Sequence, residues 1–348
     1  MEKLSKESLD ALWNLVSGSR RVTVVSHTHP DGDAVGSCVA MCSWLGSLGK
    51  DALMMLPTPV PSSLDFILGG QVPMIYSLSP RECAHRLMSS DLVICLDLNS
   101  LSRVEDMEQA INASPCRRVL IDHHLNPAVD QFDLCFSETE VSSACELLFG
   151  ILLAMPGVEG DARRLPPLCA AALMAGMTTD TNNFANSVFP ATFEMASLLL
   201  AAGVDRDAIL SGLYDSYREN RIRLFGEMLH DNLQITPSGV AVMYLSREIA
   251  DRYDLEEGES EGLVNRPLAI GRVRLSILVK AEPDGSLRVS MRSKKGVSAN
   301  QLAGEIFHGG GHEQAAGGKI IVPQDIASES EVKGYVMRMA DKFMERYA

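Results

Sequence analysis

The 348-residue sequence lacks the features that would tie it to a membrane or to an oxidising compartment. No unbroken run reaches the ~18 apolar residues of a membrane-spanning helix. The first twenty residues are typical of an amphipathic helix rather than of a signal peptide. The eight cysteines are dispersed and form no C-x-x-C pair, which is typical of small buried side chains in a reducing compartment. We therefore predict a cytoplasmic protein with no membrane partner.

Several catalytic and binding signatures are missing as well. Neither a G-x-S-x-G elbow nor a Walker A loop is present. Spacing alone leaves a Cys–His nucleophile open, but among the cysteines only Cys38 lies near the polar loops described below, inside a predicted helix. The chain has two tryptophans, Trp13 and Trp44, which offer little for an extended surface that stacks nucleic-acid bases.

Basic residues are in the minority, and they are unevenly distributed. The 31 Lys and Arg against 45 Asp and Glu give a formal net charge of −14, which argues against a protein whose whole surface binds nucleic acid. Residues 1–235 hold 16 basic and 29 acidic side chains, whereas residues 236–348 hold 15 and 16. Residues 266–295 hold eight basic and two acidic side chains. This distribution fits a cation-binding first part and a second part that holds a small anionic ligand.

The length and the 46% apolar content indicate a globular protein of about two domains. In the first part, short apolar runs predict strands at 21–26, 51–56, 91–96 and 118–121. Helices are predicted between and after them, at 34–48, 143–153, 167–177 and 191–202. Because this alternation is typical of a doubly wound α/β sheet, we predict a buried parallel sheet over residues 1–204.

The second part has a different pattern. Residues 205–235 are polar and helical and predict a linker. Residues 236–348 predict a smaller α+β domain with a mixed sheet, built from strands at 239–245, 268–280 and 286–292 and a helix at 326–346. Asp284-Gly285 predicts a hairpin turn between two of these strands.

Polar residues follow the predicted strands of the first domain, where doubly wound sheets bind their ligands. They are His27, Asp31 and Asp33 after the first strand, Asp97 after the third, Asp122, His123 and His124 after the fourth, and Asp180 on a loop after a later helix. Aspartates packed into one site would repel one another, and two divalent ions about 3.5–4 Å apart would relieve that repulsion. Added imidazoles shift the preference from Mg²⁺ or Ca²⁺ toward Mn²⁺. The expected chemistry is metal-assisted hydrolysis of phosphate esters.

Taken singly, each residue also admits a structural role. Asp33 would cap the helix that begins at residue 34, and Asp180 would form an Asx turn. The joint hypothesis depends on all of these clusters following strands or helices of one domain.

The ordered set of segments resembles the DHH phosphoesterase superfamily, named for the triplet present here as Asp122-His123-His124. Residues 26–37 (SHTHPDGDAVGS), 96–103 (LDLNSLSR) and 176–181 (GMTTDT) resemble its first, second and fourth motifs. Residues 292–318 (RSKKGVSANQLAGEIFHGGGHEQAAGG) resemble the glycine-rich signature of its DHHA1 domain. The resemblance implies an active site in the cleft between the two domains.

Carried over residue by residue, the resemblance implies two bound Mn²⁺ ions, with Mg²⁺ or another divalent metal as alternatives. Their ligands would be His27, Asp31, Asp33, Asp97, His123 and Asp180. Asp97 would bridge the ions, and His124 would act at the scissile phosphate as a charge stabiliser or a proton donor. His29 holds a variable position of the motif and is expected to have no ligand role. Asn182 stands where many relatives have glycine, and we expect it to accept a left-handed backbone.

The resemblance also implies substrate-binding residues in the second domain. They would be Arg292, Gly309, Gly310, Gly311 and His312. The glycine segment is predicted to lead into a helix, where backbone N–H groups bind an anion. Lys294 and Lys295 would either steer the substrate or form a solvated charge run.

Among its relatives, the chain is most similar to the short two-domain oligoribonuclease/3′-phosphoadenosine 5′-phosphate phosphatases. Its expected substrates are therefore very short oligoribonucleotides and small nucleotides, and we expect a homodimer. The alternatives are a cyclic or linear dinucleotide phosphodiesterase and a RecJ-like single-strand exonuclease. A nucleotide sensor without activity is the alternative outside the enzymes, although none of the six ligand positions is degenerate.

Overall fold

The computed structural model describes residues 4–256 and 258–347, which divide into two compact units with their boundary between Ser216 and Tyr217. The predicted linker, 205–235, is shared between them, because helix α8 (Arg206–Tyr214) belongs to the first unit and helix α9 (Glu219–Glu227) to the second. None of the helices in the described ranges has the length and apolar character needed to cross a bilayer.

The first unit is built on a six-stranded, fully parallel sheet of order β3-β2-β1-β4-β5-β6, which confirms the predicted doubly wound fold. Its strands are β1 (Arg21–Val25), β2 (Asp51–Leu56), β3 (Met74–Ile75), β4 (Leu92–Leu96), β5 (Arg117–Asp122) and β6 (Leu134–Ser137). Its other α-helices are α1 (Lys6–Gly18), α2 (Gly32–Ser47), α3 (Pro80–Met88), α4 (Met107–Ala113), α5 (Ala144–Leu153), α6 (Pro167–Asp180) and α7 (Pro190–Ala201).

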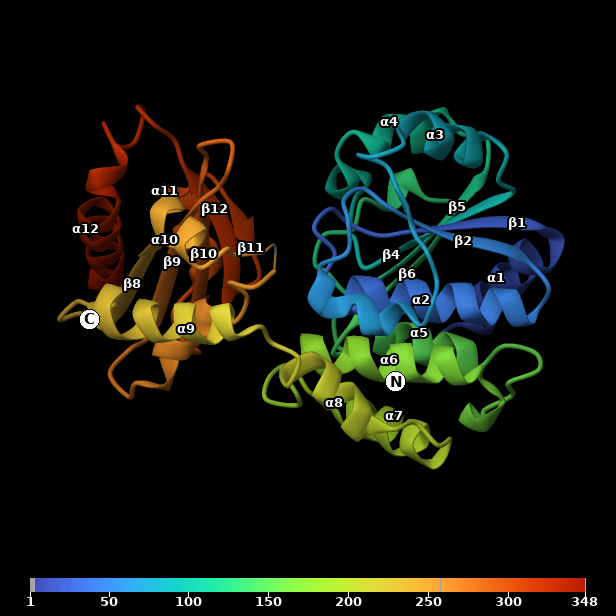
Figure 1. The fold of residues 1–348 in the computed structure, drawn as a ribbon. Helices are drawn as coiled ribbons and strands as arrows, with labels where there is room; N and C mark the ends of the chain where they lie inside the picture. The colour runs from blue at the N-terminus through green and yellow to red at the C-terminus, as the bar shows by residue number, and fades with distance from the viewer. Residues whose placement is uncertain (1–3, 257, 348) are drawn as a thin grey trace. The chain divides into compact units, whose positions relative to one another are not determined.

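Two hydrophobic cores cover the two faces of this sheet. Helices α2, α5 and α6 lie on one face and α3 and α4 on the other, as Figure 1 shows. Because successive side chains of a strand alternate between faces, Val24 enters the first core and Val25 the second. Burial on both faces explains why these strands are almost continuously apolar.

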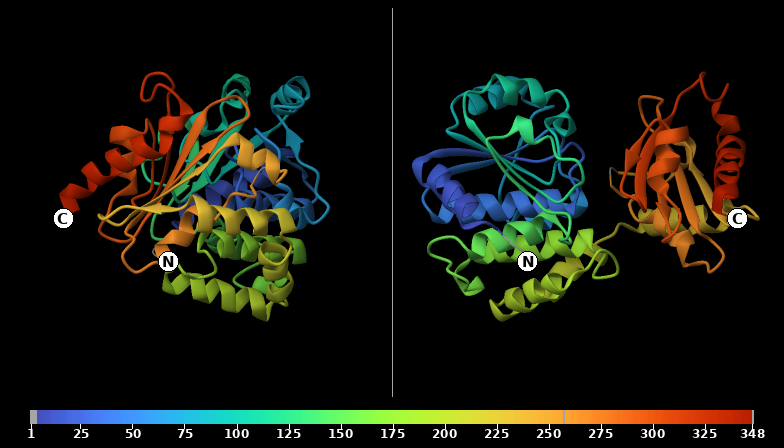
Figure 2. Two further views of the ribbon diagram at one scale, coloured as in Figure 1. Left: turned by 60° about the vertical axis from the view of Figure 1, so that its left-hand side comes forward. Right: turned by 180° about the vertical axis from the view of Figure 1, so that it is seen from behind.

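The second unit contains the predicted mixed sheet, of order β11-β12-β10-β9-β8-β7, in which β8 and β9 are parallel and the other pairs antiparallel. Its strands are β7 (Gln234–Ile235), β8 (Val240–Leu245), β9 (Leu275–Ala281), β10 (Leu287–Ser293), β11 (Gly310–Gly311) and β12 (Ala315–Ile320). Helices α11 (Ala299–Ile306) and α12 (Val332–Met344) pack on one face, and α9 and α10 (Arg247–Arg252) on the other. Figure 2 shows each unit from two further sides.

Two predicted boundaries in this unit are wrong. The strand expected at 268–280 begins only at Leu275, because Leu263–Ala269 forms a 3₁₀ helix that contains Pro267. Residues 268 and 269 complete that 3₁₀ helix, and a bend and a turn at residues 270–272 separate it from the strand. The C-terminal α-helix begins at Val332 rather than at 326, after a 3₁₀ turn at Glu329–Glu331. The hairpin turn is confirmed: Gly285 has φ 83° between the antiparallel strands β9 and β10.

Candidate metal centre

Three neighbouring strands carry the core of the site. Strands β1, β4 and β5 are adjacent and parallel, so their carboxyl ends share one edge of the sheet. The polar residues predicted to bind metal follow these ends. The strand order reverses between β1 and β4, and doubly wound sheets bind their ligands at such a reversal.

Two helices bring further aspartates to the same edge. Asp31 is the N-cap of α2, and its Oδ1 accepts hydrogen bonds from the backbone N–H groups of Asp33 (3.0 Å) and Ala34 (3.1 Å). Asp33 therefore lies in the first turn of α2 and is not its cap. Asp180 is the last residue of α6 and not, as predicted, part of a loop.

Glycines let these two helices approach closely. A Cβ on Gly36 of α2 would lie 2.7 Å from the carbonyl oxygen of Ala172 in α6, and 3.0 Å from the Cα of Gly176. Real Cβ atoms are not found so close to a backbone, so both helices depend on the missing side chain. The close packing brings the first turn of α2, with Asp33, to the last turn of α6, with Asp180.

Asp97 lies at the centre of the cluster, and its side chain is buried. One carboxylate oxygen, Oδ2, is 3.4 Å from Nε2 of His27, and the other, Oδ1, is 3.4 Å from Nε2 of His123. His123 Nε2 also lies 3.6 Å from Asp180 Oδ2 and 3.9 Å from Asp33 Oδ2. The two oxygens of Asp97 thus face two separate sets of neighbours.

The donor atoms fit a pair of divalent cations. His27, Asp31 and Asp97 form one group whose ligand atoms lie within 4.8 Å of one another, and Asp33, His123 and Asp180 form a second. The buried Oδ1 of Asp97 has no hydrogen-bond partner, and such an atom is costly unless a cation satisfies it. The structure thus brings all six predicted ligands together.

The charges of the site are unbalanced in the way that a metal would correct. Burial, together with the charge of Asp97, raises the pKa of Asp33 to about 7. Burial also raises the pKa of Asp180 well above its usual range, with the charge of Asp33 adding to it. Although burial opposes both changes, the attraction between the Asp97 carboxylate and the imidazole of His123 lowers the pKa of Asp97 and raises that of His123 to about 10. Without a metal, the negative charge of the carboxylates is therefore reduced by bound protons and by the positive charge of the imidazolium. Divalent cations would neutralise the same carboxylates.

Neighbouring groups orient the ligands. The Nδ1 of His27 lies 2.8 Å from the Thr28 carbonyl oxygen, which leaves Nε2 directed at the cluster. The carboxylate of Asp33 accepts backbone N–H groups of Ala144 (2.7 Å) and Cys145 (3.0 Å) in the first turn of α5. The sequence contains no signal for this last contact, because α5 lies more than a hundred residues from Asp33.

His124 has a different environment from the six ligands. Its Nδ1 lies 2.7 Å from Oδ1 of the fully buried Asp122, and its Nε2 lies 3.1 Å from Nη1 of Arg103. His124 also forms a possible metal-binding group with Asp97 and His123. However, the short hydrogen bond between Nδ1 and Asp122 favours a role for His124 other than metal ligation. Arg103 was missed as a site residue, although it lies inside the segment 96–103 that resembles the second motif.

Two further positions bear on the sequence predictions. Asn182 has φ 46°, so the residue found in place of glycine does adopt the expected left-handed backbone. His29 is on the exposed part of its loop, and its backbone N–H donates to Thr58 Oγ1 at 2.7 Å. It belongs to none of the possible metal groups among the described residues.

The glycine-rich segment of the second unit differs from its prediction. It follows helix α11 rather than leading into a helix, and Gly310–Gly311 form the edge strand β11 paired with β12. A Cβ on Gly309 would lie 1.9 Å from the Gly317 carbonyl oxygen, and one on Gly311 would lie 2.6 Å from that of Ala315. Gly310 has room, since the nearest atom to its Cβ would be 3.6 Å away. Packing within the sheet therefore explains two of the three glycines.

Arg292 lies near the end of β10, as predicted, and is half-buried. Its Nη1 donates to the carbonyl oxygen of Met291 at 2.9 Å, and no ion pair joins it to a carboxylate in the part of the chain that the structure describes. Burial lowers the pKa of this guanidinium, although the charge of Glu261 opposes the change. A half-buried cation with these contacts is suited to an anionic ligand. The substrate-binding roles of Arg292, the glycines and His312 stay predictions.

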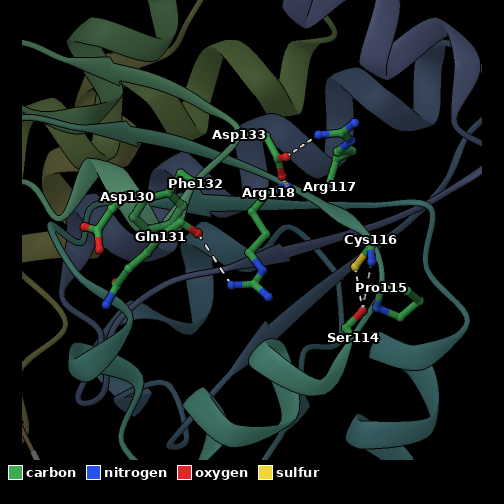
Figure 3. Close-up of a pocket in the computed structure, with 9 residues that line it drawn as sticks. All are labelled: Ser114, Pro115, Cys116, Arg117, Arg118, Asp130, Gln131, Phe132 and Asp133. Atoms are coloured by element: carbon green, nitrogen blue, oxygen red, sulfur yellow. Dashed lines mark hydrogen bonds and ion pairs between the residues drawn. The ribbon is translucent and has the colours of Figure 1, made fainter.

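A separate hollow lies at the opposite, amino end of β5 (Figure 3). Its cations already have partners: Arg117 is paired with Asp133, and Arg118 donates to Asn112 Oδ1 at 2.9 Å. None of the predicted site residues lines this hollow.

Comparison with known proteins agrees with this geometry. The DHH family, N-terminal domain, matches residues 21–177, and the DHHA1 domain matches residues 238–332. A probable bifunctional oligoribonuclease and PAP phosphatase NrnA from Streptococcus mutans is 29% identical over 303 residues, which are 85% of this chain and 88% of that protein. A cyclic-di-AMP phosphodiesterase, GdpP from Bacillus subtilis, is 25% identical over 87% of this chain, but the match spans 45% of that protein.

Solved structures give the same picture. An exopolyphosphatase-related protein from Bacteroides fragilis superimposes with a TM-score of 0.91 at 29% identity, over 99% of this chain and 98% of that one. The exonuclease RecJ bound to manganese shares the fold, with a TM-score of 0.54 at 18% identity over 97% of this chain and 93% of that one.

Proposed function

The chain is a phosphoesterase of the DHH family with a C-terminal DHHA1 domain, and we propose that it is a metal-dependent hydrolase of very short oligoribonucleotides and of 3′-phosphoadenosine 5′-phosphate. One observation carries the chemistry. The two carboxylate oxygens of Asp97 face His27 and His123 at 3.4 Å each, so one carboxylate can serve two adjacent ions. Two adjacent divalent ions are typical of phosphoester hydrolysis.

The proposed ligands of one ion are His27, Asp31 and Asp97, and those of the other are Asp33, His123 and Asp180, with Asp97 shared. When bound, the ions supply Lewis-acid stabilisation of the phosphoryl charge and a nucleophilic water at neutral pH. The mixed imidazole and carboxylate set favours Mn²⁺ over Mg²⁺. The structure of the exonuclease RecJ, a protein of the same fold, contains bound manganese, which agrees with that choice.

The remaining residues act on the substrate. Asp122 holds His124 in one orientation through the 2.7 Å bond to Nδ1, so that His124 contributes to charge stabilisation at the phosphoryl group. In the second unit, Arg292 binds the anionic end of the substrate together with the segment Gly309–His312.

Charge supports a short substrate. The first 235 residues carry 29 acidic and 16 basic side chains, which disfavours a long polyanion along that part of the chain. Residues 266–295 hold eight basic and two acidic side chains, and this local positive charge is sufficient to bind a few phosphates. The relative from Streptococcus mutans, to which this chain is similar over 88% of that protein's length, is a probable bifunctional oligoribonuclease and PAP phosphatase.

A second candidate is a cyclic or linear dinucleotide phosphodiesterase, favoured by the similarity to the cyclic-di-AMP phosphodiesterase GdpP. A RecJ-like exonuclease is the third, supported at the level of the fold. Rates on cyclic di-AMP, on its linear product and on a diribonucleotide would separate the first two candidates.

The test of the proposal is a labelled RNA ladder of two to twenty-four nucleotides, incubated with purified protein and Mn²⁺. We expect rapid hydrolysis of the shortest RNAs and a steep fall in rate with length. Equal rates on long and short strands would contradict the size limit and favour the RecJ-like alternative. Release of inorganic phosphate from 3′-phosphoadenosine 5′-phosphate tests the second activity separately.

A further inference from the structure

Arg103 is held beside the metal cluster by the turn that follows Asp97. It lies in the 3₁₀ helix Leu101–Val104, whose end residues are fully buried and anchor the turn. The carbonyl oxygen of Arg103 accepts the backbone N–H of Thr28 at 2.9 Å. This bond ties the turn to the loop that carries His27 and Asp31, so the backbone of Arg103 has a fixed place relative to both.

The guanidinium is oriented by a short relay of hydrogen bonds. Because a guanidinium has no acceptor, the 3.1 Å contact between Arg103 Nη1 and His124 Nε2 requires the ring nitrogen to accept. His124 Nδ1 then carries the hydrogen that bonds to Asp122 Oδ1 at 2.7 Å. Asp122, fully buried, also accepts the backbone N–H of His124 at 3.1 Å. The imidazole therefore has its edge toward Asp122 and its Nε2 toward Arg103.

The charge of Arg103 is not neutralised by the aspartates around it. His124 lies next to both groups: its Nδ1 is 3.6 Å from Asp97 Oδ1, and its Nε2 is 3.1 Å from Arg103 Nη1. Within residues 4–256 and 258–347, no ion pair joins Arg103 to a carboxylate, although the site holds five aspartates. One of its five N–H groups is used by His124, which leaves donors for an anion.

We propose that Arg103 is a catalytic residue that binds a non-bridging oxygen of the scissile phosphate, with His124 and Asp122 as its positioning residues. The planar guanidinium fork matches two phosphate oxygens, and a donor held in place beforehand costs no reorganisation during the reaction. In the hydrolysis, the bond from phosphorus to the water oxygen forms and that to the leaving oxygen breaks. The leaving oxygen gains the proton that water loses, and Arg103 stays protonated throughout. The inference rests on the proposed function, and it makes His124 act through Arg103.

The experiment compares the wild-type protein with Arg103→Ala and Arg103→Lys, with Arg117→Ala as the matched control. Arg117 is an exposed arginine at the opposite end of β5 from His124. Isothermal titration with Mn²⁺ alone, then with inorganic phosphate at saturating Mn²⁺, reports metal and anion binding without turnover. Hydrolysis of a diribonucleotide reports catalysis, and guanidinium chloride is added to Arg103→Ala at a concentration that leaves the fold intact, with sodium chloride as the salt control.

We expect Arg103→Ala to bind Mn²⁺ as the wild-type protein does, to bind phosphate about tenfold more weakly, and to lose about 10²–10³-fold in kcat. Added guanidinium should recover at least a tenth of the kcat that Arg103→Ala has lost, because the ion can occupy the position of the missing side chain. If the role of Arg103 were merely structural, guanidinium would not restore activity. Arg103→Lys should keep the charge and lose most of the rate, since lysine lacks the fork. Arg117→Ala should match the wild type.

Unchanged phosphate affinity in Arg103→Ala would overturn the inference. Loss of both Mn²⁺ binding and the fold in this variant would overturn it as well, because Arg103 would then have a structural role. A wild-type protein that binds Mn²⁺ but hydrolyses none of the tested phosphoesters would instead refute the proposed function. In that case the phosphate titrations would still decide whether Arg103 binds the anion.

Discussion

Substituting Gly36 by alanine tests whether the close packing of α2 and α6 builds the metal centre. The new Cβ would lie 2.7 Å from the Ala172 carbonyl oxygen, and an ordinary contact requires at least 3.4 Å. The obstacle is backbone, which cannot move aside as a flexible side chain would. The two helices must therefore separate by several tenths of an ångström, and Asp33 and Asp180 with them.

The energetic cost follows from the same contact. Overpacking a tight core contact costs about 1–3 kcal/mol, and replacing glycine by alanine within a helix returns up to about 1 kcal/mol. Since the clash is with backbone, we expect the free energy of unfolding to fall by about 1–2 kcal/mol. Metal affinity should fall as well, because Asp33 and Asp180 ligate the same proposed ion.

The control is Gly46→Ala in the same helix. A Cβ there meets nothing within 4 Å, so the substitution should leave Mn²⁺ affinity unchanged and raise stability slightly. Urea unfolding measures the stability of both variants, and isothermal titration measures their Mn²⁺ affinity. A Gly36→Ala protein as stable as Gly46→Ala, with wild-type Mn²⁺ affinity, would refute the argument.

Four other substitutions test three separate parts of the account. His123→Ala should reduce turnover at least 10²-fold and weaken Mn²⁺ binding, while its circular dichroism spectrum stays close to that of the wild type. Full activity of this variant would exclude His123 as a metal ligand. In the second unit, Gly309→Ala should lower the free energy of unfolding by more than about 1 kcal/mol. Gly310→Ala should have the wild-type stability and a higher KM for a diribonucleotide. Equal stability of the two variants would contradict the conclusion that packing requires a glycine at 309 but not at 310. Asp91 accepts backbone N–H groups of Arg21 and Arg20, and these bonds lower its pKa. Its charge therefore adds stability above the unfolded-state pKa of about 3.9, and that stability is lost as the pH falls through the folded-state value. Asp91→Asn should thus be less stable than wild type by up to about 1 kcal/mol at pH 7, with the difference shrinking as the pH falls below about 3.9; a difference that does not change with pH would contradict this.

The sequence predicts the first unit better than the second, for a physical reason. Strands β1, β2, β4 and β5 are apolar runs buried on both faces, and their composition alone marks them. Strand β12 has the sequence AAGGKI, which has little intrinsic strand preference. It forms because Gly318 allows close approach to Phe307, and because Gly309 and Gly311 allow the preceding segment to approach β12 closely. That contact is tertiary and leaves no local signal.

The candidate site shows the same division. The clustering of the six proposed ligands could be predicted, because each follows a recognisable strand or helix and because the segments resemble one family. Arg103 could not, since its role depends on a 3.1 Å contact with a side chain twenty-one residues away. The α5 N–H groups that hold Asp33 are likewise visible only in the folded chain.

The central claim is that Asp97 connects two divalent ions in one site, and electron paramagnetic resonance during a Mn²⁺ titration tests it most directly. Its buried carboxylate has one oxygen toward each ligand group. We predict two Mn²⁺ ions per chain at saturation, with the spectrum of an exchange-coupled pair. A single ion per chain, or two ions with uncoupled spectra, would contradict the account.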